Sequence, residues 1–155
     1  MQSDEFPDTS AGGDPTVDDA GLGMLLAAAH QRCREAFNNG LGAAGVEARQ
    51  FGVLRTLSRH GPTNQRHLLE LLHVDKSAMV RIIDELERKG LAVRARDSHD
   101  RRAYAVDLTE DGRERLVVMD RIASDVGAEL FSWLRPRERR QLVDLLDRLA
   151  DRTTS

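Results

Sequence analysis

The sequence predicts a mainly α-helical fold with a small two- to three-stranded β element, an α+β arrangement. Apolar residues recur at helical intervals over most of the chain. Between residues 91 and 108 the pattern changes to alternation, which is typical of short strands. With 155 residues and 40% hydrophobic content the chain can bury one core, so we expect a single domain.

Two helices are expected before the central segment. The first has one apolar stripe, and the second has another that ends before Gly61 and Pro62, which stop it. The first stripe is Leu22, Leu25, Leu26, Ala29, Cys33 and Phe37, and the second is Phe51, Leu54 and Leu57.

Two further helices follow in close succession. Thr63 is the expected N-cap of a short helix over residues 64–72, and only His73 and Val74 separate it from the next. Asp75 is the expected N-cap of that next helix, and Gly90 ends it with a left-handed residue. Its apolar side consists of Met79, Val80, Ile82, Ile83 and Leu86.

The alternating segment predicts two antiparallel strands. Leu91, Val93 and Ala95 are expected on one face of the first strand, and Tyr104, Val106 and Leu108 on one face of the second. The polar residues 97–102 form the tip between them. Helix, tight turn, helix and hairpin together predict a winged helix-turn-helix, in which the second helix enters the DNA major groove.

Two helices are expected after the hairpin. Thr109 can cap a long one that runs through Leu134, and Pro136 can start the last, which runs through Ala150. Their apolar stripes exceed what a compact winged helix needs for its own core. We therefore expect the terminal helices of two chains to form an intertwined dimerisation layer.

One motif resembles that of a known family. Asp100, Arg102, Leu108, Thr109 and Gly112 form the pattern D-x-R-x5-L-T-x-x-G, which is similar to the wing signature of MarR-type bacterial transcription regulators. The preceding DKSAMVRIIDELERKGLAVR resembles the recognition helix and first wing strand of that family, and the likeness spans about residues 20–150. It implies a homodimeric regulator, usually a repressor, that releases DNA when a small, often aromatic, molecule binds or a cysteine is oxidised.

The distribution of charge and the resemblance to the family together predict how the chain divides into a domain and two tails. The formal net charge is -3, but six acids and no basic residue give the first 21 residues -6, which leaves +3 for the rest. We expect a disordered acidic tail over 1–17, a single MarR-like domain over 18–150 and a C-terminal tail over 151–155. Within the domain, 61–109 is the winged helix-turn-helix, and 18–60 and 110–150 are dimerisation and support helices.

The helix N-termini supply the first DNA-binding candidates. Ser77, Ala78 and Arg81 are expected on the open face where base edges lie, with Lys76 on phosphate. Asn64 and Gln65 begin the preceding helix, where their amides either meet phosphate or only cap. Arg81 has a plainer alternative, an ion pair with Glu85 on a solvated face.

The hairpin supplies the remaining candidates. Arg101 is expected in the minor groove, with Arg96 and His99 near DNA. The family pattern implies that Arg102 ties back to an acid of the recognition helix, for which Asp84 is the candidate, and that Asp100 supports the wing. Two recognition helices related by symmetry predict an inverted-repeat operator with half-sites about 34 Å apart.

Other functions have less support in the sequence. Cys33, the only cysteine, lies on an apolar stripe, which favours a structural role over oxidation sensing. The five histidines are scattered, so we expect no metal site and no cofactor. No catalytic motif or long apolar span is present, so we expect a cytoplasmic non-enzyme. A winged-helix adaptor that binds only protein remains an alternative.

Overall fold

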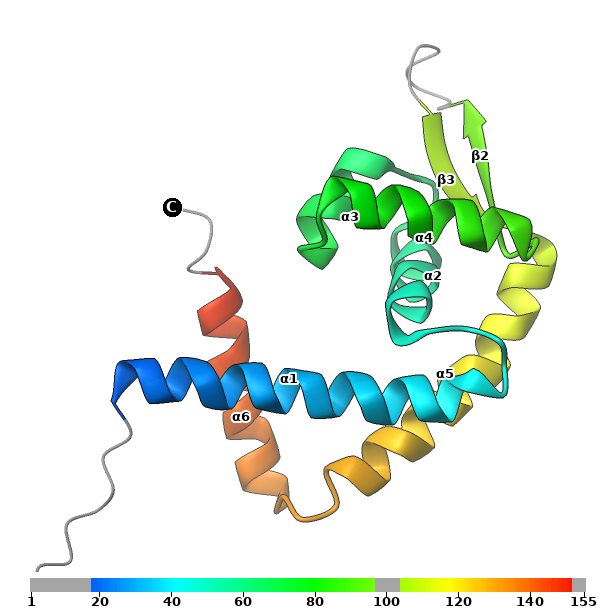
Figure 1. Cartoon of the computed structure of the whole chain (residues 1–155). Helices are drawn as coiled ribbons and strands as arrows, with labels where there is room; N and C mark the ends of the chain where they lie inside the picture. Colours follow the sequence, from blue (N-terminus) through cyan, green and yellow to red (C-terminus); the bar gives the residue numbers. More distant parts are fainter. Residues whose placement is uncertain (1–17, 97–103, 152–155) are drawn as a thin grey trace, which may run out of the picture. The chain divides into compact units, whose positions relative to one another are not determined.

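The computed structural model describes residues 18–96 and 104–151 (Figure 1). These residues form six helices and three short strands, which confirms the mainly α-helical class with a three-stranded sheet. The helices are α1 (Asp19–Gly42), α2 (Ala48–His60), α3 (Gln65–Leu72), α4 (Lys76–Arg88), α5 (Glu110–Leu130) and α6 (Pro136–Asp151), and the strands are β1 (Thr63–Asn64), β2 (Ala92–Arg96) and β3 (Tyr104–Leu108).

The chain divides into two units, residues 1–32 and 33–155. The described part of the first unit is the beginning of α1, where the apolar side chains of Leu22, Met24 and Leu25 are exposed. The second unit holds the end of α1 and all the other elements. The expected acidic tail over residues 1–17 lies outside the described residues, as does most of the expected C-terminal tail.

The sheet is antiparallel, with β3 between β1 and β2. Thr63 pairs with Val106, and Arg94 pairs with the same residue from the other side. Thr63 is therefore a strand residue, and its expected role as a helix cap is wrong. Asn64 caps α3 instead, because its side-chain oxygen accepts a hydrogen bond from the amide of His67 at 2.8 Å.

The face assigned to the first wing strand is also wrong. Val93 is 44% exposed, whereas Leu91 and Ala92 are both buried. The reason is that Leu91 still belongs to the turn after α4, where its amide donates to the carbonyl of Leu86. The strand starts one residue later than expected, so the alternation shifts by one and turns Arg94 toward α4.

The core of the second unit lies between α2, α4, α5 and the sheet. Completely buried leucines and isoleucine from α2 and α4 pack with Met119 of α5 and with Leu41 near the end of α1. The fully buried members from α2 and α4 include Leu54, Ile83 and Leu86. This packing holds the winged helix-turn-helix on α2 and α5.

Apart from the cap of α3, the helix boundaries follow the expected caps with one exception. Asp75 caps α4, Thr109 caps α5 and Gly90 has a φ of 70°, all as expected. However, α5 ends at Leu130 and not at Leu134, because residues 131–134 form tight turns before Pro136. The residue before a proline avoids the helical region, which separates α5 from α6.

Candidate nucleic-acid interface

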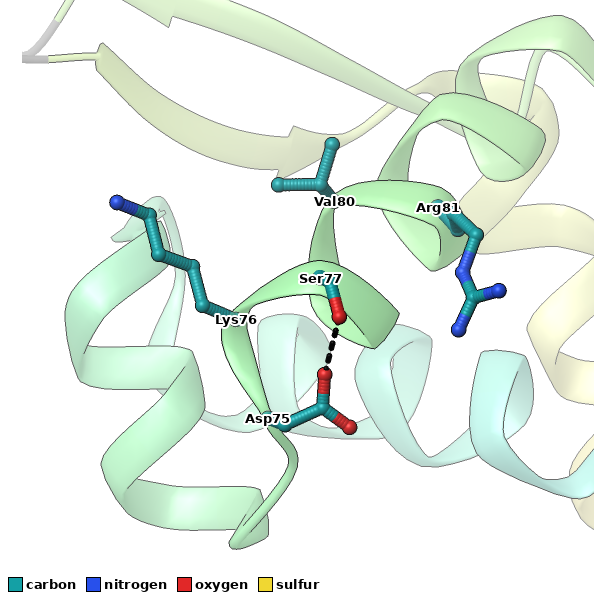
Figure 2. A pocket seen from close by; sticks show the side chains of 5 residues that line it. All are labelled: Asp75, Lys76, Ser77, Val80 and Arg81. Atoms are coloured by element: carbon teal, nitrogen blue, oxygen red, sulfur yellow. Dashed lines mark hydrogen bonds between the residues drawn. The ribbon is translucent and has the colours of Figure 1, made fainter.

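The beginning of α4 is the candidate base-reading surface. Asp75, Lys76, Ser77, Val80 and Arg81 line a shallow hollow there (Figure 2). Lys76, Ser77 and Arg81 are exposed, and Figure 2 shows the Lys76 and Arg81 side chains extending in different directions from the helix. Two cations and one hydroxyl are thus presented at a helix N-terminus, the end that approaches base edges in this class of motif.

A capping carboxylate fixes this end of the helix. One oxygen of Asp75 accepts hydrogen bonds from the Ala78 amide at 2.8 Å and from the Ser77 hydroxyl at 2.7 Å. The hydrogen bond from the Ala78 amide holds the pKa of Asp75 below its ordinary value, and the hydrogen bond from Ser77 and the positive charge of Arg81 lower this pKa further. The cap therefore stays ionised at neutral pH and keeps the first turn of α4 rigid.

Two residues of α4 differ from the sequence prediction. Ala78 is only 4% exposed, so its expected place on the open face is wrong. Its side chain faces the core because it lies one turn before Ile82. Val80, which the helical spacing predicts on the apolar side, is half-buried and lines the hollow. Its methyl groups suit contact with a thymine methyl group, a feature that helical spacing alone does not reveal.

The start of α3 lies beside the sheet. Asn64 is exposed and uses its side-chain oxygen as the cap, which leaves the amide nitrogen of the same group as a donor. Gln65 is half-buried. The two residues expected at phosphate therefore differ in access, and Asn64 is the more accessible.

Arg94 joins the wing to the candidate recognition helix. Its guanidinium donates to Asp84 at 2.7 Å and also to Glu87, while its amide donates to Glu87 at 2.8 Å. Asp84 thus contacts the wing through Arg94. The expected pairing of Asp84 with Arg102 stays a prediction, because Arg102 lies outside the described residues. Arg94 is not recognisable from the sequence as a partner of α4, because the strand face is displaced by one residue from the one that the alternation predicts.

The remaining wing candidates lie at or beyond the end of the described strands. Arg96 is exposed and pairs with Tyr104, which is 58% exposed. The candidates His99, Asp100 and Arg101 lie outside the described residues. The alternative ion pair between Arg81 and Glu85 is not formed within the described residues, where Glu85 accepts a hydrogen bond from Gln50.

Cys33 and the possible metal ligands lie outside this surface. Cys33 is half-buried and has a free thiol, so it is less enclosed than its apolar stripe predicted. Within residues 18–96 and 104–151 no three His, Cys, Asp or Glu side chains are grouped to hold a metal ion. No helix in those ranges has the length and apolar character needed to cross a membrane.

Comparisons with known sequences point to one family. A family model described as the MarR family matches residues 44–103. The HTH-type transcriptional repressor NicR of Pseudomonas putida is 30% identical over 84% of this chain and 82% of its own length. A putative transcriptional regulatory protein for the hcr operon of Thauera aromatica is 30% identical over 68% of this chain, and the match covers 63% of that relative.

Solved structures agree with these matches. A mutant of MarR from E. coli in complex with operator DNA has a TM-score of 0.76 and 28% identity, and the match covers 83% of this chain and 92% of that one. BpsR of Bordetella bronchiseptica, whose DNA binding is regulated by 6-hydroxynicotinic acid, has a TM-score of 0.77 and 30% identity, over 84% of this chain and 93% of that one.

Proposed function

This chain belongs to the MarR family of DNA-binding transcriptional regulators, and we propose that it is a homodimeric repressor of an inverted-repeat operator. The observation that supports this most is the exposed set of Lys76, Ser77 and Arg81 at a rigidly capped helix N-terminus. We propose further that a small molecule releases the repressor from DNA.

Each residue of α4 has a proposed role. Arg81 pairs bidentately with a guanine, Ser77 meets an adjacent base edge, and Val80 contacts a thymine methyl group. Lys76 binds phosphate and fixes the register of the helix on DNA without reading sequence. Asn64 at the start of α3 donates its amide to a second phosphate, with Gln65 beside it.

The wing supplies the second contact. The cations Arg96 and Arg101 are proposed to enter or line the minor groove, where the potential is most negative when the groove is narrow. We propose that His99 contacts phosphate and that Arg102 and Asp100 support the wing. Arg94 sets where this hairpin leaves the recognition helix, because it binds both Asp84 and Glu87.

The homodimer is supported by apolar side chains that the described chain leaves exposed. Helix α6 has no buried residue, although it carries a stripe of large apolar side chains. The stripe consists of Val143, Leu145, Leu146 and Leu149, each between 43% and 54% exposed. Exposed apolar stripes of this size on terminal helices favour association with a second copy. Two copies place two α4 helices on successive major grooves, which requires an inverted repeat.

The effector is proposed to be a small aromatic molecule. This rests on BpsR, whose DNA binding is regulated by 6-hydroxynicotinic acid and which shares the fold and 30% of the residues. The relatives are named as transcriptional regulators, so we assign this chain no catalytic role, and we place it in the cytoplasm with its operator.

Selection of bound duplexes from a random library at physiological salt tests the proposal. We expect an inverted repeat with half-sites about 34 Å apart, and an affinity that falls steeply with salt concentration because counterions are released from phosphate. If no sequence is enriched and binding does not depend on salt, the proposal is wrong and the chain is a winged-helix adaptor that binds protein.

A further inference from the structure

The side chain of Gln50, in the first turn of α2, is a polar group inside the core. It is 1% exposed. Its oxygen accepts hydrogen bonds from the Lys89 ammonium at 2.7 Å and from the Glu47 amide at 3.2 Å, and its nitrogen donates to the carboxylate of Glu85. Lys89 also donates to the carbonyl of Gly45 at 2.7 Å. One buried amide thus joins α2, α4 and the loop between α1 and α2.

These hydrogen bonds are not needed to fill the site. A leucine has nearly the shape of glutamine and would bury more apolar surface there without any polar group to satisfy. The bond from the Glu47 amide is local to the start of α2. The bonds to Lys89 and Glu85 add direction, because they are made only at one orientation of α4 relative to α2. The network therefore fixes the geometry of α4 on α2 more than it adds to the packing.

The network holds the end of α4 that is far from the candidate reading surface. Glu85 lies in its last turn and Lys89 caps its end, whereas Ser77 and Arg81 lie in its first two turns. A helix of this length is a rod of about 20 Å, so a change of tilt at one end displaces the other. Bidentate contact between an arginine and a guanine tolerates little displacement.

We propose that Gln50 is a positioning residue for DNA reading, which sets through Glu85 and Lys89 the angle at which α4 enters the major groove. This inference rests on the proposed function, because it assigns a role in an operator complex. Gln50 itself touches no DNA. Its loss should therefore weaken recognition of the operator and leave the attraction to any duplex unchanged.

The network can lose Gln50 without unfolding α4, so a role in positioning the helix can be distinguished from a role in folding. Glu85 in the last turn of α4 and Lys89 at its C-cap are four residues apart, the spacing at which a glutamate and a following lysine pair with each other. When Gln50 is removed, these two side chains can pair within α4, so the helix persists while its tie to α2 is lost.

The test compares operator and random duplexes of equal length in the full-length protein, with the operator taken from library selection. For Gln50→Leu we expect an operator affinity reduced roughly tenfold, within the range by which residues remote from a ligand change binding, and a random-duplex affinity that is unchanged. Lys89→Met should give the same split. Because Lys89 is exposed, that variant keeps the core intact if Gln50→Leu fails to fold.

An exchange variant provides the rescue. In Gln50→Glu combined with Glu85→Gln, the carboxylate moves to α2 and the amide to α4, and every hydrogen bond of the network can form again. We expect operator affinity to return to within about twofold of wild type. The matched control is Arg115→Met, which removes another side chain bonded to the same loop, at the Ala44 carbonyl, but does not touch α4. It should leave both affinities unchanged.

Two results would overturn the inference. One is an unchanged operator affinity in Gln50→Leu and Lys89→Met, and the other is an equal loss on both duplexes without rescue by the exchange, which would mean a purely structural role. Neither result bears on the proposed function. That function is tested by the preference of the wild-type protein for operator over random duplex.

Discussion

Arg94 contacts two acids of α4 at once, and this contact orients the wing. We expect Arg94→Met to lower the free energy of unfolding by about 1 kcal/mol. The effect is modest because solvent screens the charges of this partly exposed group of ion pairs. Operator affinity should fall as well, because the hairpin loses its fixed direction. Thermal unfolding and titration of operator DNA measure the two effects.

The control for Arg94 is Arg66→Met. Arg66 pairs with Glu70 on the outer face of α3, where its side chain is 90% exposed. Loss of such a pair changes stability by at most about 0.5 kcal/mol. Equal effects of the two substitutions on stability and binding would mean that the Arg94 cluster does not orient the wing.

Asp75 gives the reading end of α4 a dependence on pH. Its pKa is lowered in the folded protein, first by the Ala78 amide, so the ionised cap stabilises the fold above the unfolded pKa of about 3.9, and this contribution disappears as pH falls through the folded pKa. The advantage of wild type over Asp75→Asn in unfolding temperature should be full near pH 6 and vanish toward pH 2. An advantage that stays constant over this range would contradict the assignment.

At the scale of the elements, Thr109 and Gly112 join the wing to α5. The Thr109 hydroxyl accepts from the Gly112 amide at 2.9 Å and donates to the Gly90 carbonyl at 2.6 Å. A Cβ at position 112 would lie 2.0 Å from the Leu91 carbonyl oxygen. The threonine and glycine of the sequence motif are thus explained by a close approach between the start of α5 and the turn after α4.

The matched pair Gly112→Ala and Gly52→Ala tests this contact. Both glycines lie in helices, but nothing lies within 4 Å of a Cβ at position 52. We expect Gly112→Ala to destabilise the fold by about 2 kcal/mol or more through overlap with backbone, and Gly52→Ala to stabilise it by about 0.5–1 kcal/mol. Chemical denaturation measures both, and equal shifts would exclude the clash.

The elements also mark how far the sequence predicts the structure. Caps are local, so Asp75, Thr109 and Gly90 are recognisable from neighbours in the chain. The tie between Gln50 and Glu85 is not, because it joins residues 35 positions apart. The face of β2 differs from the sequence prediction for another reason. Its register depends on where the turn after Gly90 ends, and a shift of one residue exchanges the two faces.

At the scale of the whole molecule, α6 offers the clearest test of assembly. Leu145 and Leu149 lie one turn apart and are each 50% exposed. We expect the protein to sediment as a dimer. The double variant Leu145→Glu with Leu149→Glu should be a monomer, because burying two carboxylates in the interface costs more free energy than the remaining apolar contact supplies. Gln141→Glu on the same helix should remain dimeric. A wild-type monomer at micromolar concentration would contradict the proposed homodimer.

The central claim is that the beginning of α4 reads base edges, and it is tested most directly by the operator preference of Arg81→Ala. We expect a loss of about 1–3 kcal/mol in discrimination against a substitution at one base pair of each half-site, with preference elsewhere retained. Arg88→Ala, seven residues later on the same helix, should alter affinity for all duplexes alike or not at all. Unchanged discrimination in Arg81→Ala would contradict the assignment of this surface as the reader.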